Sequence, residues 1–228
     1  MPPCSDRTGY SALIPAWNAA VTIADTIRSI LDQSVPPREI IVVDDGSTDD
    51  TGAIAAACDA RVRVIRQDNQ GPGAAMTRGM GQVSCPILAT LDADDLWLPG
   101  KMAAQLAHLA ADPDCGMVFS HMRTFQHSDG PEGPGSVSPG WSRSTMTART
   151  DLARQIGAIT DPPGRRGEMI DWLARGRHLG IRMDMLDSVH ALRRLHPGSL
   201  SDGRSAARDR GYARVAWLAL QRRKEQRP

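Results

Sequence analysis

Three aspartates follow an apolar run in the stretch LATLDADDLWLPGKM, which covers residues 88–102. Asp92, Asp94 and Asp95 stand directly after residues that are typical of a buried strand. Like charges this close repel one another, so water, a cation or a bound polar ligand must offset them. The alternation of Asp92 and Asp94 places two carboxylates on one turn, where both can reach a hard cation such as Mg²⁺ or Mn²⁺. The run therefore predicts a site at which a cation bridges to a diphosphate.

A plainer interpretation of the same run stays open. Asp94 or Asp95 could cap a helix that begins at Pro99, a position in which aspartate is common. The Asp-x-Asp pattern is short and also arises by chance, so the stretch alone does not decide between the two.

Polar residues also follow the other candidate strands of the first half. Trp17 and Asn18 come after an apolar run at 10–15, and the pair Asp44 and Asp45 ends a second run at 39–44. The carboxyl ends of parallel strands form the ligand site of an open α/β sheet. Ser47 or Asp49 could cap a helix here as well, but capping does not explain the doubled acids.

The elements that must position these residues follow an alternating pattern. Apolar runs predict strands at 10–15, 39–44, 62–65, 86–92 and 115–120, and apolar residues at helical spacing predict helices near 20–33, 49–59, 73–82 and 100–111. Continuous apolar strands that alternate with helices indicate an α/β fold with a mostly parallel central sheet, covered on both faces.

The second half carries a weaker pattern. Gly, Pro and Ser predict a flexible loop at 128–140, of a kind that often serves as a lid. Helices are expected near 149–156, 167–178 and 203–224, with extended or turn structure at 181–195. The last helix ends in a basic run, which favours docking on the body or a homodimer partner, with a weak membrane-surface contact as the alternative.

Composition excludes several classes of protein. The 228 residues are 41% hydrophobic and carry a formal net charge of +1, which gives no general attraction to nucleic acid. The four cysteines form no C-x-x-C pair, so we expect free thiols in a reducing compartment. The sequence shows neither a secretory signal nor an apolar run long enough for a membrane-spanning helix. We expect a cytoplasmic, soluble chain.

The sequence resembles the family 2 glycosyltransferases, which have the GT-A, Rossmann-like fold of nucleotide-diphospho-sugar transferases. Three stretches carry the resemblance in order: ALIPAWNAAVTIADTIRSILDQSVPPREIIVVDDGSTDDT, then NQGPGAA with LDADDLWLPGKMAAQL, and last GEMIDWLARGRHLGIRMDMLDSVHALRRLHPGSLS. It implies one GT-A domain over 8–200, with a nucleotide-sugar-binding half at 8–120 and an acceptor-side half at 121–200. A helical extension would occupy 201–228.

The resemblance also implies roles for single residues. Asp45 would contact the nucleotide base. Asp94 would ligate the metal that clamps the diphosphate. Asp92 would face the ribose or the metal. The remaining nucleotide-sugar contacts would be Pro15, Trp17, Asp44 and Ala93. His196 would be a further metal ligand, because some GT-A enzymes use a late histidine, and Arg193 and Arg194 would be either diphosphate ligands or a surface pair.

The catalytic base would be an acid in GEMIDW. Glu168 matches the first acid of the family's common Glu-Asp pair, Met169 replaces the second, and Asp171 lies nearly one turn further on. A family variant that lacks the second acid keeps GE-x-x-DW, which favours Asp171. Both acids could instead be ordinary charges at the start of a helix.

The implied reaction is inverting glycosyl transfer from a nucleoside diphosphate sugar, most simply a UDP-sugar, to an acceptor hydroxyl with Mn²⁺ or Mg²⁺. The acceptor could be a glycan, a lipid-linked saccharide, a peptide or a small metabolite. One departure from the family pattern keeps a second class open: the usual GPGAARN reads GPGAAMT here, so an Arg is lost at Met76. With Met169, this loss would suit a catalytically weakened nucleotide-binding or scaffold protein. A dinucleotide oxidoreductase is excluded because no G-x-G-x-x-G follows the first strand.

Overall fold

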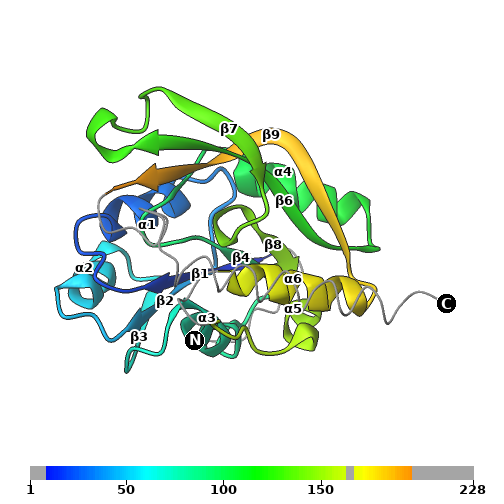
Figure 1. Ribbon diagram of the computed structural model, residues 1–228, viewed down its shortest axis with the longest axis horizontal. Helices are drawn as coiled ribbons and strands as arrows, with labels where there is room; N and C mark the ends of the chain where they lie inside the picture. The colour runs from blue at the N-terminus through cyan, green and yellow to red at the C-terminus, as the bar shows by residue number, and fades with distance from the viewer. Residues whose placement is uncertain (1–8, 163–166, 197–228) are drawn as a thin grey trace.

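The computed structural model describes residues 9–162 and 167–196, and these form one sheet with helices on both faces (Figure 1). The strands follow the order β3-β2-β1-β4-β8-β6-β9-β5 across the sheet, and β7 pairs with β6 outside this path. The strands are β1 (Tyr10–Ala16), β2 (Glu39–Asp45), β3 (Val62–Gln67), β4 (Ile87–Thr90), β5 (Leu96–Trp97), β6 (Cys115–Gln126), β7 (Gly135–Gly140), β8 (Thr147–Arg149) and β9 (Arg182–Leu195).

The first half of the sheet is parallel. Strand β1 pairs in parallel with both β2 and β4, and β2 pairs in parallel with β3. Their carboxyl ends therefore point to one edge of the molecule, on the left in Figure 1. This edge is where the polar residues that follow β1, β2 and β4 must meet.

The second half is mixed, which the alternating pattern did not reveal. Strand β8 runs antiparallel to both β4 and β6, whereas β6 and β9 form a long parallel pair. The short β5 closes the far edge antiparallel to β9. The expected α/β fold is confirmed, with a central sheet that becomes mixed after β4.

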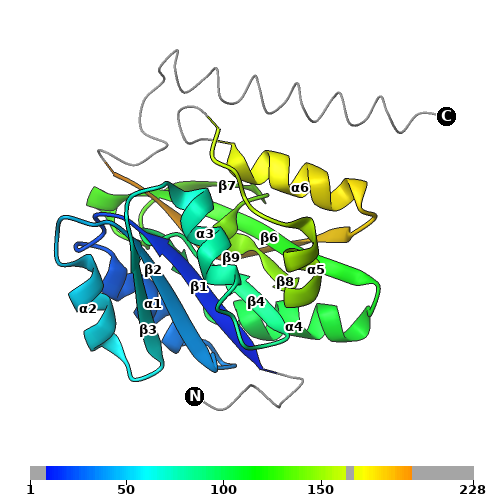
Figure 2. The same ribbon diagram turned by 90° about the horizontal axis from the view of Figure 1, so that it is seen from below.

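The helices divide between the two faces of the sheet because neighbouring strand residues point to opposite sides. Ala12 and Ile14 pack on one face with α1, α2 and α4, while Leu13 faces α3, α5 and α6 on the other (Figures 1 and 2). The helices are α1 (Ile23–Leu31), α2 (Thr51–Cys58), α3 (Pro72–Met80), α4 (Lys101–Ala111), α5 (Thr150–Ile156) and α6 (Glu168–His178).

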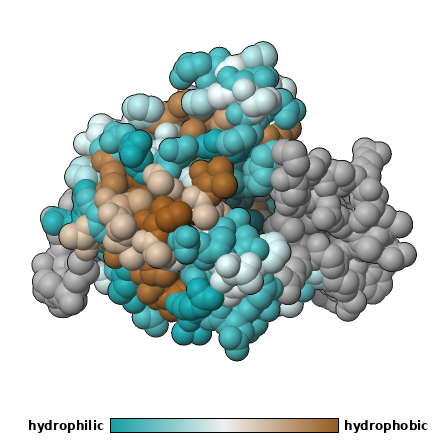
Figure 3. Space-filling model, turned by 90° about the vertical axis from the view of Figure 1, so that its left-hand side faces the viewer, coloured by the Kyte–Doolittle hydropathy of each residue, from teal (hydrophilic) through white to brown (hydrophobic). Residues whose placement is uncertain are grey.

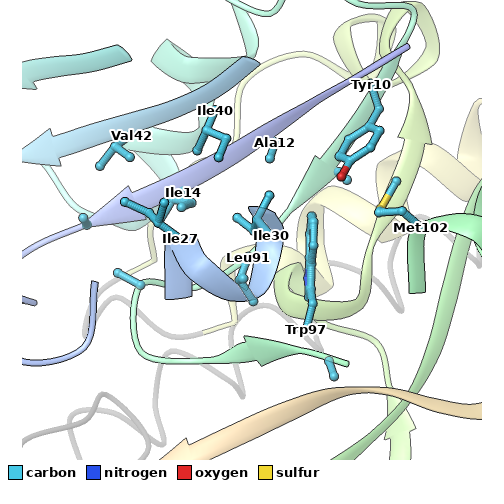
Figure 4. Packing of buried hydrophobic residues seen from close by; sticks show 14 of the residues in the cluster. Tyr10, Ala12, Ile14, Ile27, Ile30, Ile40, Val42, Leu91, Trp97 and Met102 are labelled. Atoms are coloured by element: carbon cyan, nitrogen blue, oxygen red, sulfur yellow. The ribbon is translucent and has the colours of Figure 1, made fainter. Parts of the chain in front are cut away.

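The core under α1 shows how this packing forms. Ile23, Ile27 and Ile30 recur at helical spacing and are fully buried. They contact the strand residues that alternate toward this face, together with Trp97 and Met102 (Figure 4). Burial of such side chains contributes roughly 1.5–3 kcal/mol each, so this face ties β1, β2 and α1 into one unit.

The predicted loop at 128–140 is only partly a loop. Residues Gly135–Gly140 form β7, which pairs antiparallel with β6, and a short 3₁₀ helix occupies His127–Asp129. Strand β7 lies outside the main strand path and pairs with β6 along one of its edges. Proline has no N–H to donate to a ladder hydrogen bond, so Pro139 is tolerated only because β7 lies on such an edge. The loop predicted from composition is therefore wrong for Gly135–Gly140, because main-chain pairing with β6 makes these residues a strand.

The other predicted elements compare well with the structure. The helices expected near 149–156 and 167–178 are α5 and α6, and the extended segment at 181–195 is β9. The helix expected at 203–224, and with it the predicted extension and its contacts, lies outside the described residues. Cys58, Cys85 and Cys115 carry free thiols, as expected.

A buried polar network supports the turn that follows β7. Lys101 is fully buried, and its Nζ donates to Gln105 Oε1 (2.7 Å) and Thr147 Oγ1 (3.1 Å) and lies 4.2 Å from the centre of the Trp97 ring. Gln105 in turn donates to the carbonyl of Thr145. This network holds the 3₁₀ turn η2 (Arg143–Thr145) against α4.

Candidate functional site

The segment after β1 is fixed by contacts to the segment after β2. Asn18 adopts a positive φ of 48°, which asparagine tolerates better than most residues. Its Oδ1 accepts a hydrogen bond from the backbone N–H of Thr48 (2.8 Å), and its own N–H donates to Ser47 Oγ (3.0 Å). Trp17 stays 56% exposed beside this turn. A large aromatic face is therefore presented to solvent on a fixed backbone.

The two acids at the end of β2 have different partners. Asp45 accepts hydrogen bonds from Gln67 Nε2 (2.8 Å) and from the backbone N–H groups of Gln70 (2.9 Å) and Gly71 (2.8 Å), so it holds the loop before α3. Asp44 accepts from the N–H of Ser47 and pairs with Arg66 at 2.7 Å. Both acids are buried.

Gly46 lets these two acids stand at the tight end of β2. Its φ of 74° is rare for other residues, and a Cβ at this position would lie 2.8 Å from the backbone nitrogen of Asn69. Any side chain would therefore collide with the loop that Asp45 holds. The sequence DDGS therefore needs glycine at this position, because the loop before α3 approaches the backbone of Gly46 closely.

The acidic run after β4 is tied to α1. The carbonyl of Ala93 accepts hydrogen bonds from the hydroxyls of Thr22 and Thr26, both at 2.9 Å. Asp95 is buried, and its carboxylate accepts from Ser144 Oγ (2.5 Å) and from the N–H of Arg194 (2.9 Å). Burial and the neighbouring Asp94 and Asp92 raise the pKa of Asp95 well above its usual range. The carboxylate of Asp95 is therefore held by Ser144 and Arg194 of the protein itself.

Asp94 and His196 meet although they are far apart in the sequence. His196 Nε2 lies 3.1 Å from Asp94 Oδ2. Burial and the charge of Asp92 raise the pKa of Asp94, and the contact with His196 opposes this shift. A carboxylate that shares its surroundings with a second acid is stabilised by a nearby positive charge. The fold thus brings into contact two residues that the resemblance places near the cation.

Arg143 connects two acids that the sequence places in different motifs. Its Nε donates to Asp92 Oδ1 at 2.6 Å, and its Nη1 donates to Glu168 Oε1 at 2.5 Å. The Arg143 and Glu168 side chains are about nine-tenths buried. Burial alone would lower the pKa of Arg143, but the charges of Asp92 and Glu168 outweigh it and raise that pKa. The guanidinium is therefore a fixed positive charge between the two carboxylates.

Glu168 and Asp171 point to different surroundings at the start of α6. Glu168 reaches Arg143, whereas Asp171 Oδ2 accepts from Arg175 Nε at 3.1 Å, one turn further along the helix. Arg175 also donates to the carbonyls of Ile156 and Ala158. Asp171 thus belongs to a contact between α6 and the segment after α5.

Residues from these segments surround one cavity of about 810 Å³ at the carboxyl ends of β1, β2 and β4. Figure 3 faces this edge and shows hydrophobic side chains gathered below the β6–β7 hairpin, with hydrophilic ones around them. The predicted site residues that line the cavity are Pro15, Trp17, Asp45, Asp92, Ala93, Asp94, Glu168 and His196. Asp44 and Asp171, also predicted, are not among the lining residues.

Sequence reasoning missed one central residue and misjudged another. Arg143 lies after β7, in a segment without a strand-end pattern, so nothing local marked it. Arg194 was expected either on the surface or at a diphosphate, but it is only 6% exposed and donates to the backbone carbonyl of Asp94 and to His127. The surface alternative for Arg194 is wrong, because the charge is buried beside the acidic run.

The two methionines that depart from the family pattern share one environment. Met76 is fully buried and Met169 is 7% exposed, and both belong to the hydrophobic cluster beneath α3 and α6. Neither position could hold a charge there without a partner. The loss of an Arg at Met76 and of an acid at Met169 therefore leaves this cluster apolar.

Solved structures with the same fold define the class of this protein. The S. aureus protein TarS, solved in complex with UDP-GlcNAc, superposes with a TM-score of 0.76 over 94% of this chain and 66% of its own, at 18% identity. The mannosyltransferase PcManGT from Pyrobaculum calidifontis, in complex with GDP-Man and Mn²⁺, gives 0.71 over 97% of this chain and 66% of its own, also at 18% identity. The fold is that of the GT-A glycosyltransferases.

The sequence narrows this class to a family. The profile of glycosyl transferase family 2 matches residues 11–167, more than half of the chain. The succinoglycan biosynthesis protein ExoU of Rhizobium meliloti is 38% identical over 104 residues, which cover 44% of this chain and 30% of ExoU. The chain belongs to glycosyl transferase family 2. It spans less than a third of the length of ExoU.

Among the described residues, none of the helices combines the length and the apolar character that crossing a bilayer requires.

Proposed function

We propose that the chain catalyses inverting, metal-dependent transfer of a sugar from a nucleoside diphosphate sugar to an acceptor hydroxyl. The observation that carries this proposal is the convergence of Asp45, Asp92, Asp94 and Glu168 on one cavity, although they come from three separate sequence motifs. A cavity of about 810 Å³ is of the size that small-molecule ligands occupy in proteins.

The donor would enter with its base at the segment after β1. Trp17 offers an exposed aromatic face for stacking, and Asp45 lines the cavity next to it. Asp45 already accepts three hydrogen bonds, and a carboxylate has about four acceptor positions, which leaves one for a base. A UDP-sugar is our preferred donor. TarS was solved with UDP-GlcNAc and PcManGT with GDP-Man, so both nucleotides need testing.

The site fits a divalent cation. Asp94 and His196 present a carboxylate oxygen and an imidazole nitrogen within 3.1 Å, and Asp92 offers a further carboxylate in the same cavity. Oxygen and imidazole donors suit Mn²⁺, and oxygen donors suit Mg²⁺. When bound, the cation would neutralise the charge that grows on the departing diphosphate. Asp94 and His196 would hold it, and Asp92 would join them only by turning from Arg143, because its carboxylate lies outside the spacing of a three-ligand set.

Glu168 is our proposed base. The sequence favoured Asp171, but the structure places Glu168 in the cavity lining and turns Asp171 toward Arg175. Glu168 can take the proton of an acceptor hydroxyl from this position, and Arg143 fixes the direction of its carboxylate. A base opposite the leaving group allows direct displacement with inversion, and such proton transfer contributes about 10² to 10⁴ in rate.

One observation favours the alternative of a nucleotide-binding or scaffold protein. Glu168 is already engaged by Arg143, which also holds Asp92, so the proposed base must exchange or share this contact during a reaction. A protein that only bound a nucleotide could keep the bridge closed permanently. Both alternatives share the donor site, and they differ in whether a sugar is transferred.

The acceptor remains a class of compounds, namely hydroxyl groups of a glycan, a lipid-linked saccharide, a peptide or a small metabolite. ExoU is named for succinoglycan biosynthesis, which makes a saccharide acceptor the first choice for an assay.

Thermal melts with uridine and guanosine diphosphates, each with and without Mn²⁺, test the donor site. A ligand that binds only the folded chain stabilises it by about 2.7 kcal/mol at a hundred times its Kd. We expect stabilisation by at least one nucleotide, dependent on Mn²⁺ and lost in Asp94→Ala. Melts that no nucleotide changes would reject the donor site, and stabilisation without any turnover on any nucleotide sugar would favour the scaffold alternative.

A further inference from the structure

A second group of chemically active side chains lies outside the cavity. His108 comes from the last turn of α4, Cys115 begins β6, and Asp184 lies near the start of β9. One potential ligand atom from each of the three lies within 4.8 Å of the others, and His108 Nε2 lies 2.8 Å from Asp184 Oδ2. Within residues 9–162 and 167–196, this is the one group of three or more such side chains with metal-binding spacing.

The group is remote from the proposed transfer site. Cys115 begins β6, whereas Met122 of the same strand lines the cavity, seven residues further on. A strand rises about 3.3 Å per residue, so roughly 23 Å of β6 separates the two places. The end of α4 and the starts of β6 and β9 lie together on the right of Figure 1, away from the carboxyl ends of the parallel strands.

We propose that His108, Cys115 and Asp184 bind one Zn²⁺ ion. A thiolate and an imidazole are the ligands that zinc prefers, and a carboxylate oxygen completes a set of three protein ligands. Zinc is tetrahedral, so water takes the fourth position. Cys115 binds as the thiolate, and its proton passes to solvent as the S–Zn bond forms.

Without an ion, the side chains of this group are held by other contacts. Cys115 Sγ donates to the carbonyl of Met117, and burial together with the nearby Asp184 raises the pKa of Cys115 to about 11. Arg182 donates to Asp184 Oδ2 at 3.3 Å and also pairs with Asp112. The guanidinium is 44% exposed and can keep Asp112 as its partner when the ion takes Asp184. Zinc therefore replaces the proton of Cys115, the hydrogen bond between His108 and Asp184, and one long ion pair.

The ion would connect side chains of three elements, α4, β6 and β9. Helix α4 would be fastened to β6 and β9 at their starts, where the two strands form their long parallel pair. Binding to the folded chain alone stabilises it in proportion to the logarithm of the zinc concentration. The inferred site thus serves stability, and its metal differs from the cation of the transfer site, whose proposed ligands include no sulfur.

Cobalt titration of the reduced full-length chain tests this inference, because a thiolate bound to Co²⁺ gives an intense near-ultraviolet charge-transfer band. We expect the band to saturate at one equivalent and to disappear when Zn²⁺ is added. Cys115→Ser should abolish it and His108→Ala should weaken binding at least tenfold, whereas Cys58→Ser and Cys4→Ser should retain it. Asp94 and His196 contain no sulfur, so their cation cannot produce this signal.

Three results would overturn the inference. The first is the absence of the band in the wild-type chain with a large excess of cobalt. The second is a band that survives in Cys115→Ser, and the third is a band that Cys4→Ser or Cys58→Ser removes. Circular dichroism of each variant checks that it folds, and His108→Ala provides an independent variant if Cys115→Ser does not. Mn²⁺-dependent release of nucleoside diphosphate should persist in Cys115→Ser, which separates this test from that of the transfer site.

Discussion

At the scale of single residues, Arg143 determines how the acids of the cavity are held. It donates to Asp92 and Glu168 through two different nitrogens, and its side chain is only 10% exposed. Removing one partner of a buried ion pair costs about 3–5 kcal/mol because the other charge is left uncompensated. We expect Arg143→Met to lower the free energy of unfolding by an amount of this order, as measured by urea denaturation.

The matched control is Arg175→Met, which removes a more exposed guanidinium from Asp171. An i,i+4 pair on a helix surface contributes about 0.3–0.5 kcal/mol, although the carbonyl contacts of Arg175 add to this. Equal losses in the two variants would show that Arg143 has no special role in holding the acids.

The choice between the two candidate bases is also a question for single residues. We expect Glu168→Gln to lower kcat by about 10² to 10⁴, because the amide cannot accept the acceptor's proton. Asp171→Asn should change kcat little, since Asp171 faces Arg175. Steady-state kinetics of the two variants decides: a large loss in Asp171→Asn with an active Glu168→Gln would restore the assignment that the sequence favoured.

The sequence predicted the residues that directly follow strands, and it failed where the fold brings distant segments together. Asp92 and Asp94 were found because a buried strand leads into them. Arg143 has no such local signal, since its two partners come from the segment after β4 and from α6. The spacing of Glu168 and Asp171 could not show which one Arg175 would engage.

At the scale of elements, the buried lysine of α4 makes stability depend on pH. Burial lowers the pKa of Lys101 well below its usual range. In the unfolded chain the lysine keeps its proton up to about pH 10.4. Between these two pKa values the unfolded state binds more protons, so the free energy of unfolding rises with pH.

Replacing this lysine isolates its contribution. In Lys101→Met, Gln105 and Thr147 can still bond to each other, because Thr147 Oγ1 lies 2.6 Å from Gln105 Oε1. We expect the variant to be as stable as the wild type or more stable at neutral pH, since no amine has to be desolvated. The difference in Tm between the two should shrink toward pH 10, and a difference that grows with pH would contradict the assignment.

The elements themselves were mostly predictable, and the exceptions have a common cause. Helices α1 to α4 and strands β1 to β4 follow local apolar patterns, so their order and approximate bounds were correct. Strand β7 was not predicted, because its Gly, Pro and Ser residues carry no strand pattern and its pairing with β6 is a tertiary effect. The mixed second half of the sheet depends on similar pairings between distant strands.

At the scale of the whole molecule, nucleotide and cation should act as one ligand. A nucleoside diphosphate with Mn²⁺ at a hundred times its Kd adds about 2.7 kcal/mol. For a chain of this size each kcal/mol raises Tm by about 2–4 °C, which gives an increase of roughly 5–10 °C. Differential scanning fluorimetry measures this shift. An equal shift without the metal would separate nucleotide binding from the proposed cation.

The central claim is that the cavity transfers a sugar with Glu168 as base and Asp94 as a ligand of the cation. The most direct measurement is the release of nucleoside diphosphate from a panel of nucleotide sugars, with saccharide acceptors, by the wild type, Asp94→Ala and Glu168→Gln. We predict Mn²⁺-dependent release by the wild type with at least one donor, and a loss of at least about a hundredfold in each variant. Release that persists in both variants, or that ignores the metal, would contradict the account.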